Sequence, residues 1–536
     1  MRNIIIKTGV AAVLAGMLVG CTGNYLAINT NPYEVSKEQT LTDGYAIGAA
    51  ITALCGTIVS TDVNTAQFTD CLLGGPMGGY YSSTGAWQKT IDNYNATDDW
   101  TRVFMASDRI IPTLYSNLSE LQNITDDPVT LAIAKTIKVA AMLRVTDTYG
   151  PIPYTQIGVG GKITVPYDSQ EQVYDAMFAE LDEVISTLTE NKLSAISPNA
   201  DPVYDGTAVK WCRFANSLKL RMAMRIVYAN QEKAKKYAEE AVNHEIGVIT
   251  ANADNAALRP VAFGEKGNPL YNAIKYNQPT GCVTGGDTHA AADIICYMNG
   301  YNDPRRPVYF IPSEFEGEEY VGIRIRIEKP ALNTVGRKYS GVNIAPSDPI
   351  VWLNAAEVAF LKAEAALFGF NVGGQAGDFY NEGVRLSFEE HNVSGYESYI
   401  MDEVSKPTAY ADPAGLNSYP SLLSEITIKW DDAATPEQMQ ERIITQKWIA
   451  IFNNGNEAWA DYRRTNYPRL MPATDAGNKS DGLVSSEFGA RRMKYPLAEY
   501  TNNGENVNAA VSQYLGGPDR MSTRLWWDCN PAIEIK

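Results

Sequence analysis

Histidine is scarce in this chain, with three in 536 residues, and they stand apart from one another: His244, His289 and His391. His244-Glu245 does not begin a zinc-protease motif, because position 248 is Val where that motif needs a second histidine. The sequence also lacks the G-x-S-x-G elbow, the phosphate-binding loop and the dinucleotide-binding glycine pattern. No catalytic residue is therefore predicted, and the chain is expected not to be an enzyme.

Cysteine gives no sign of a metal or cofactor. Six cysteines follow Cys21, and no two of them form a C-x-x-C pair: Cys55, Cys71, Cys212, Cys282, Cys296 and Cys529. We therefore expect neither a metal site nor a cofactor. The pairs 55/71 and 282/296 have spacings that would close short disulfide loops in an oxidising compartment, but free thiols are the favoured prediction.

Long apolar runs are absent beyond the N-terminus, so no membrane-spanning helix is predicted there. At the N-terminus, Arg2 and Lys7 flank a short apolar run that ends in Leu18-Val19-Gly20-Cys21. This ending resembles the bacterial lipobox, and residues 1–20 are predicted to be a signal peptide. Cys21 is then the lipidated first residue of the mature chain, while an ordinary secretory signal is the alternative.

Positive charge is in deficit. The formal net charge is −17, and removal of residues 1–20 takes away Arg2 and Lys7, which makes it −19. Such a surface repels nucleic acid and acidic lipid, so no nucleic-acid partner is expected. Charged residues make up 20% and hydrophobic residues 45% of the chain, which is typical of a folded globular protein.

Amphipathic helical patterns dominate what is present. Ser169 and Gln172 have the form of a capping box, and apolar residues then recur at three- and four-residue steps up to Leu188. Asn354 is a predicted N-cap of another helix that ends at Gly369. Further helical patterns cover residues 211–222 and, roughly, 130–147, 230–243, 378–391 and 437–453. The predicted fold class is mainly α.

Long irregular stretches rich in Gly, Pro, Asn and Tyr separate these helices, notably residues 72–96, 249–350 and 394–436. Loops of this length in a helical protein are usually functional. Within the middle stretch, residues 320–328 alternate polar and apolar side chains, which favours a short strand.

Eight segments, taken together and in order, resemble the SusD/RagB family of nutrient-binding outer-membrane lipoproteins. They are residues 29–32 (NTNP), 146–154 (TDTYGPIPY), 167–171 (YDSQE), 211–225 (WCRFANSLKLRMAMR), 303–305 (DPR), 354–369, 446–468 and 491–502. The resemblance implies a SusD-like α-helical scaffold of tetratricopeptide-like helix pairs with long irregular loops. It also implies a signal peptide at 1–20, a lipidated tether at 21–40 and a single SusD-like domain at 41–536.

The same resemblance implies a function. We expect a lipid-anchored protein of the cell outer membrane that faces outside, binds nutrient oligosaccharides and delivers them to a SusC-like TonB-dependent transporter. The membrane contact would be made through the lipid anchor. Peptide cargo, a surface glycoside hydrolase that uses a pair of carboxylates, and a lid that binds only its transporter are the alternatives.

Tyrosine outnumbers phenylalanine by 31 to 14, and sugar or peptide binding calls for aromatic faces on an exposed rim. Family members commonly place such rings after the first helix and in the central stretch. The predicted ligand-binding residues are Tyr80, Tyr81, Trp87, Tyr271, Tyr276 and Tyr301. The alternative is that these rings fill loop-to-helix packing or touch the transporter. Arg463 and Arg464 are predicted to be ion-pair partners of Asp461 and Glu457.

Overall fold

A computed structural model describes residues 44–84, 90–97, 101, 104–105, 110–161 and 164–535. Cys21 and Trp87 lie outside the described residues. The fold is mainly α, as predicted from the periodicity. Its α-helices are α4 Tyr45–Cys55, α5 Val63–Ala66, α6 Gly75–Met77, α8 Ile110–Ile124, α9 Pro128–Tyr149, α10 Gln170–Glu190, α11 Ala208–Arg225, α12 Gln231–Val242, α13 Pro269–Ile274, α14 Ala292–Gly300, α15 Arg306–Tyr309, α16 Ala355–Leu367, α17 Ala376–Glu390, α18 Tyr396–Tyr399, α19 Pro436–Ala450, α20 Gly455–Thr465, α21 Leu497–Asn502 and α22 Gly504–Gln513.

Shorter elements complete the chain. A π-helical segment, η2, spans Gln67–Gly74, and 3₁₀ turns are found at η3 Val159–Gly161, η4 Pro198–Ala200, η5 Asn252–Asp254, η6 Pro260–Lys266 and η7 Val335–Lys338. The strands are β1 Tyr81–Ser83, β2 Ala256–Leu258, β3 Thr288–Ala290, β4 Phe310–Ile311, β5 Gly341–Val342 and β6 Ile350–Leu353. They pair as three antiparallel two-stranded ribbons, β1–β3, β2–β6 and β4–β5.

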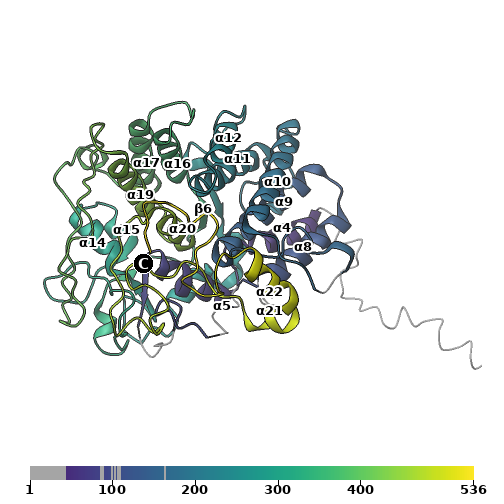
Figure 1. The fold of residues 1–536 in the computed structure, drawn as a ribbon. Helices are drawn as coiled ribbons and strands as arrows, with labels where there is room; N and C mark the ends of the chain where they lie inside the picture. The colour runs from purple at the N-terminus through teal and green to yellow at the C-terminus, as the bar shows by residue number, and fades with distance from the viewer. Residues whose placement is uncertain are drawn as a thin grey trace, which may run out of the picture.

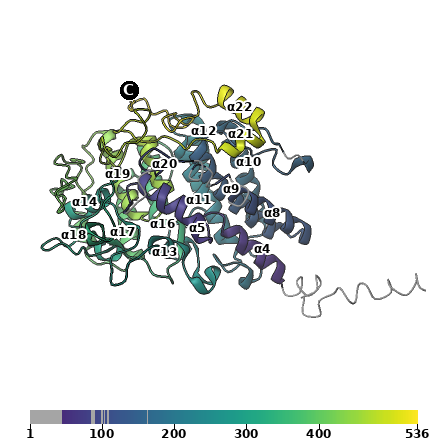
Figure 2. The ribbon, with the colours of Figure 1, turned by 90° about the horizontal axis from the view of Figure 1, so that it is seen from below.

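Successive long helices pack against one another in pairs. Helix α9 packs on α10, α10 on α11, α11 on α12, and α16 on both α17 and α19. Figure 1 shows these helices side by side across one half of the molecule, while irregular segments fill the other half around α14 and α15. Figure 2 shows the same division from below, with α4 and α8 at the helical end and α18 among the loops.

The predicted helix starts are confirmed at the atomic level. Ser169 and Gln172 form the capping box of α10, and the Asn354 side chain accepts a hydrogen bond from the backbone N–H of Glu357 at the start of α16. Helix α16 ends at Leu367, just before Gly369, whose φ of 78° suits a glycine. The four roughly placed helices correspond to α9, α12, α17 and α19.

The strand predicted at residues 320–328 is wrong. Within it, Ile323 forms one isolated bridge to Ala291, and Arg326 has a φ of 59°, which breaks the extended conformation. The alternation did not mark a sheet face, because the polar members Arg324 and Arg326 are buried together with the isoleucines between them. This segment is a buried, irregular connection beneath the surface loops.

A buried ionic network joins the central helices. Arg225 on α11 pairs with Glu457 on α20 at 2.5 Å, and Lys447 on α19 lies 2.7 Å from Asp461 and 3.1 Å from Glu457. Each of these side chains is almost inaccessible to solvent. Because charges removed from water need partners with good geometry, the network fixes how these helices sit against each other.

This network makes stability sensitive to acid. Burial alone would raise the pKa of Glu457, but Arg225, Lys447 and Arg221 outweigh it and hold that pKa well below the usual range. The stability that a depressed carboxylate contributes is present above its unfolded pKa of about 4.3 and is lost as pH falls through the folded value. We expect the free energy of unfolding to fall between about pH 4 and pH 2, and Glu457→Gln to flatten this dependence in denaturant titrations. An equal slope in the variant would contradict the assignment.

Two further features concern membrane and thiol chemistry. Within the described ranges, no helix has the length and apolar character needed to cross a bilayer. The six cysteines after Cys21 are free thiols, and five of them are buried. Burial raises the pKa of Cys55 and Cys71, so these thiols are held in the neutral form.

Candidate ligand-binding face

The ribbon β1–β3 brings together the two regions in which ligand-binding aromatics were expected. Ser83 pairs with Thr288, and the backbone N–H of Thr84 donates to the Asp287 carbonyl at 2.8 Å. The chain that leads on to Trp87 therefore leaves the ribbon beside the end of the 276–287 segment. Residues about 200 positions apart in the sequence are thus held side by side in a buried ribbon.

Three more segments meet near this ribbon. The Asn93 amide donates to the carbonyls of Gly477 at 2.6 Å and Ile327 at 3.2 Å, and the backbone N–H of Lys479 donates to the Asn93 carbonyl at 2.8 Å. Arg324 donates to the Pro472 carbonyl at 2.8 Å and to the Ser418 carbonyl at 3.4 Å. We call the surface formed by residues 95, 97, 276–287, 412–419 and 472–483 the loop face; Thr84 and residues 90–94 lie buried beside it.

The loop face exposes large apolar and aromatic groups. Tyr276 is 49% exposed, and exposed aliphatic side chains stand on the same segments at Val283, Leu416 and Leu483. The Arg324 guanidinium lies 5.2 Å from the ring centroid of half-buried Tyr419, a cation–π geometry. Aromatic and aliphatic surface next to exposed loop amides is chemistry that suits a sugar or a peptide.

Of the six predicted binding residues, Tyr80, Tyr81 and Tyr301 are buried, so the structure does not support them as stacking surfaces. The Tyr80 hydroxyl donates to the Trp448 carbonyl at 2.5 Å and the Tyr301 hydroxyl to the Ile426 carbonyl at 2.9 Å. The Tyr81 hydroxyl donates to the Asn453 side chain at 2.5 Å. Their polar ends are satisfied inside the protein, as expected of core tyrosines. Tyr271 is half-buried against the core, and Trp87 lies outside the described residues.

The glycine-rich run before Tyr80 explains this burial. A Cβ on Gly455 would lie 2.3 Å from the Gly74 carbonyl carbon, and one on Gly78 would lie 2.6 Å from the Gly455 carbonyl oxygen. The run therefore packs closely against α20 and is not an open loop. This packing places Tyr80 and Tyr81 in the interior of the protein. In the sequence, the four-residue spacing of Gly74 and Gly78 indicates one helical face of glycines. That face can be recognised as a packing surface only once its packing partner is known.

Gly455→Ala should destabilise the protein by about 1–3 kcal/mol, because the added methyl group meets backbone atoms of Gly74 and Gly75 that cannot move aside easily. The measurement is the free energy of unfolding in urea. Gly504→Ala is the matched control, since a Cβ there meets no atom within 4 Å. If the two variants are equally stable, the proposed close packing is contradicted.

Tyr419 and Arg324 were not among the predicted binding residues. Tyr419 lies in the 394–436 stretch, and no local pattern separates it from neighbouring tyrosines. Its position over Arg324 depends on a contact between segments some 95 residues apart in the sequence. No sequence signal for this contact was available.

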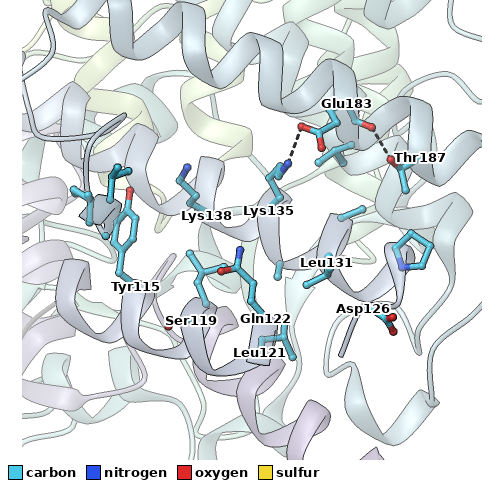
Figure 3. A pocket seen from close by; sticks show the side chains of 18 residues that line it. Tyr115, Ser119, Leu121, Gln122, Asp126, Leu131, Lys135, Lys138, Glu183 and Thr187 are labelled. Carbon is cyan, nitrogen blue, oxygen red and sulfur yellow. Dashed lines mark hydrogen bonds and ion pairs between the residues drawn. The ribbon is translucent and has the colours of Figure 1, made fainter. Parts of the chain in front are cut away.

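Two cavities lie away from the loop face. The first, of about 580 Å³, is lined by α8, α9, α10 and the Ile157–Val159 segment. Figure 3 shows Lys135 and Lys138 on one side of it with Tyr115 and Gln122 opposite. Both lysines are already paired, with Glu183 and Glu180 at 2.7 Å each. The second cavity, of about 360 Å³, lies between β6, α15 and the ends of α17 and α19. Neither is lined by a predicted binding residue.

The predicted ion-pair role is confirmed for Arg464 but not for Arg463. Arg464 binds Glu364 through two hydrogen bonds of 2.6 and 2.9 Å and also contacts Asp461 at 3.0 Å. Arg463 instead donates to the backbone carbonyls of Asp147 and Arg491, and its guanidinium stacks 3.7 Å from the Trp459 ring centroid. Both arginines are structural, because both are buried.

Comparison with known proteins agrees with this architecture. The family model of SusD-like proteins, described as Susd and RagB outer membrane lipoprotein, matches residues 27–528. A SusD homologue of Bacteroides uniformis is 58% identical over 91% of this chain and 100% of its own, with a TM-score of 0.88. One from Bacteroides thetaiotaomicron is 39% identical over 90% and 99%, with a TM-score of 0.82.

A third solved structure is described as a chitin-binding SusD homologue from Flavobacterium johnsoniae. It is 35% identical over 90% of this chain and 99% of its own, with a TM-score of 0.82. No curated protein sequence matches the chain. The helix pairs, the long loops and a family match over nearly the whole length lead to one conclusion: this chain belongs to the SusD-like family.

Proposed function

We propose that this chain is a lipid-anchored outer-membrane protein that captures nutrient oligosaccharides on its loop face and delivers them to a SusC-like TonB-dependent transporter. The observation that carries the proposal is the likeness over nearly the full chain to a SusD homologue described as chitin-binding. The exposure of Tyr276, on a segment that is hydrogen-bonded to Thr84, supports the loop face as the proposed binding surface. Binding and release need no covalent step, and the proposed role is not enzymatic.

The anchor contributes through geometry. Cys21 is proposed to carry the lipid, with residues 1–20 removed, 21–40 as the tether and 41–536 as one domain. A tether keeps the protein beside the transporter at a high effective concentration, so that modest affinity between the two suffices. Cys21→Ser should release the protein from the membrane fraction without changing its unfolding curve. Full retention in the membrane would contradict lipidation at this position.

The capture role is tested with the soluble chain from Thr22 onward, titrated calorimetrically against panels of oligosaccharides and peptides. The proposal expects saturable binding of at least one oligosaccharide and recovery of that saccharide intact. Binding of peptides alone would indicate that the cargo is a peptide, and release of shorter sugars would indicate a hydrolase. No binding on either panel would favour a lid that forms its binding site only together with the transporter.

A further inference from the structure

The 360 Å³ cavity has the size and composition of a small-molecule site. It is walled by Tyr309, Trp352 and Phe452, with amides of Asn343 and Asn453 and the side chains of Glu390, His391 and Asp348 among its lining. Small-molecule sites are commonly concave, largely apolar and furnished with a few convergent polar groups. It shares no lining residue with the loop face, so a ligand here would not compete with one bound at the loops.

The charge of this cavity is one-sided. The described residues that line it include no lysine or arginine. They do include three carboxylates: Asp348, Glu357 and Glu390. Glu357 is neutralised by Arg221, which donates to its two oxygens at 2.8 and 2.7 Å. Neither Asp348 nor Glu390 has an ion-pair partner within the described part of the chain. His391 supplies no positive charge, because burial lowers its pKa to about 4.

Burial and hydrogen bonding act in opposite directions on the charge of Glu390. Its two oxygens accept hydrogen bonds from the amides of Asn255 at 2.9 Å and Asn354 at 2.8 Å. Both amides are held in this orientation, because their oxygens accept backbone N–H groups of Ala355 and Glu357. These two hydrogen bonds favour the ionised form of Glu390. Burial opposes ionisation and raises the pKa of Glu390 to about 7. A bound cation would relieve that cost.

A polar pair lines the same cavity. The Tyr309 hydroxyl and His391 Nε2 lie 3.1 Å apart, and both residues are part of the cavity wall. When the Tyr309 hydroxyl donates to His391, its oxygen can still accept a hydrogen bond from a ligand hydroxyl.

We propose that this cavity binds a small organic ammonium ion that also carries hydroxyl groups, with Glu390 and Asp348 as its counter-charges and the Tyr309 hydroxyl as an acceptor for one of its hydroxyls. The aromatic walls fit the carbon skeleton of such a ligand and tolerate a cation near a ring face. An amino sugar with a free amine is one compound of this class. The site is additional to the loop face and does not depend on the capture function proposed above.

The test uses a matched pair of probes and the soluble chain from Thr22 onward. trans-4-Aminocyclohexanol is titrated against the chain at pH 8 and 0.15 M salt. Its amine stays charged at this pH, because the pKa of a lysine-like amine is about 10.4. trans-1,4-Cyclohexanediol has the same skeleton without the charge. The amine should bind saturably and at least about tenfold more tightly than the diol, and glucosamine should compete with it.

Variants locate the site. Glu390→Gln should weaken binding of the amine at least about tenfold. Asp348→Asn should weaken it about threefold. Asp348 lies on a surface segment, and the new asparagine keeps an acceptor oxygen there. Glu389→Gln is the control, because Glu389 is exposed and pairs with Arg385 on the outer face of α17. Equal binding of the diol, no saturable binding of the amine, or indifference to both cavity variants would overturn the proposal. Loss of glycan binding in Trp87→Ala with amine binding intact would show that the two sites are separate.

Discussion

Arg464→Met should destabilise the protein by about 3–5 kcal/mol, the largest effect expected of a single replacement here. The change removes the guanidinium that makes two hydrogen bonds to Glu364, and it leaves that fully buried carboxylate without a cation. The Glu364 carboxylate would keep one neutral donor, Gln440 at 2.8 Å. The free energy of unfolding in guanidinium chloride measures the effect.

Two comparisons sharpen this prediction. The double variant Arg464→Met/Glu364→Leu should recover part of the loss, because replacing a buried ion pair by apolar groups costs less than breaking it. Arg385→Met removes an exposed pairing with Glu382 and Glu389 and should cost less than about 1 kcal/mol. If Arg464→Met proves no more costly than Arg385→Met, the pair does not stabilise the fold as argued.

Trp87→Ala should weaken binding of a captured oligosaccharide at least about tenfold, which corresponds to about 1.4 kcal/mol. Aromatic side chains often dominate binding energy because they bring a large rigid apolar surface to the ligand. Tyr276→Ala should weaken it by a smaller factor, since half of that ring is already covered by the protein. Calorimetric titration with the strongest saccharide from the panel measures both.

The control for this pair is Tyr45→Ala. Tyr45 begins α4 at the helical end, and its ring is exposed, so its loss should leave binding unchanged. Unfolding curves of all three variants exclude loss through misfolding. If neither Trp87→Ala nor Tyr276→Ala weakens binding of the saccharide, the loop face is not the capture site.

Helices were predictable because their signals are local. The capping residues Ser169 and Asn354, with apolar spacing behind them, placed α10 and α16 to within a few residues. The loop side was less predictable, because the same local signal has two tertiary outcomes. The alternation at residues 320–328 predicted a strand, yet Arg324 and Arg326 are buried like the isoleucines beside them. The glycines before Tyr80 predicted an open loop, yet they allow the backbone of α20 to pack closely against them.

The candidate site was predicted in part. The sequence placed its aromatics in two regions, and the ribbon β1–β3 joins those regions, but burial separates Tyr276 from the core tyrosines. Tyr419 and Arg324 were out of reach, because their contact spans distant loops. The second cavity was also out of reach, since His391 and Glu390 meet Tyr309 and Trp352 only in the folded chain.

Hydrogen–deuterium exchange tests the central claim most directly, with the soluble chain compared in the presence and absence of the oligosaccharide that binds most strongly in the panel. We expect new protection in residues 84–97 and 276–287, with little change in α8, α9 and α10. Protection confined to those three helices, with the two loop segments unchanged, would contradict capture on the loop face.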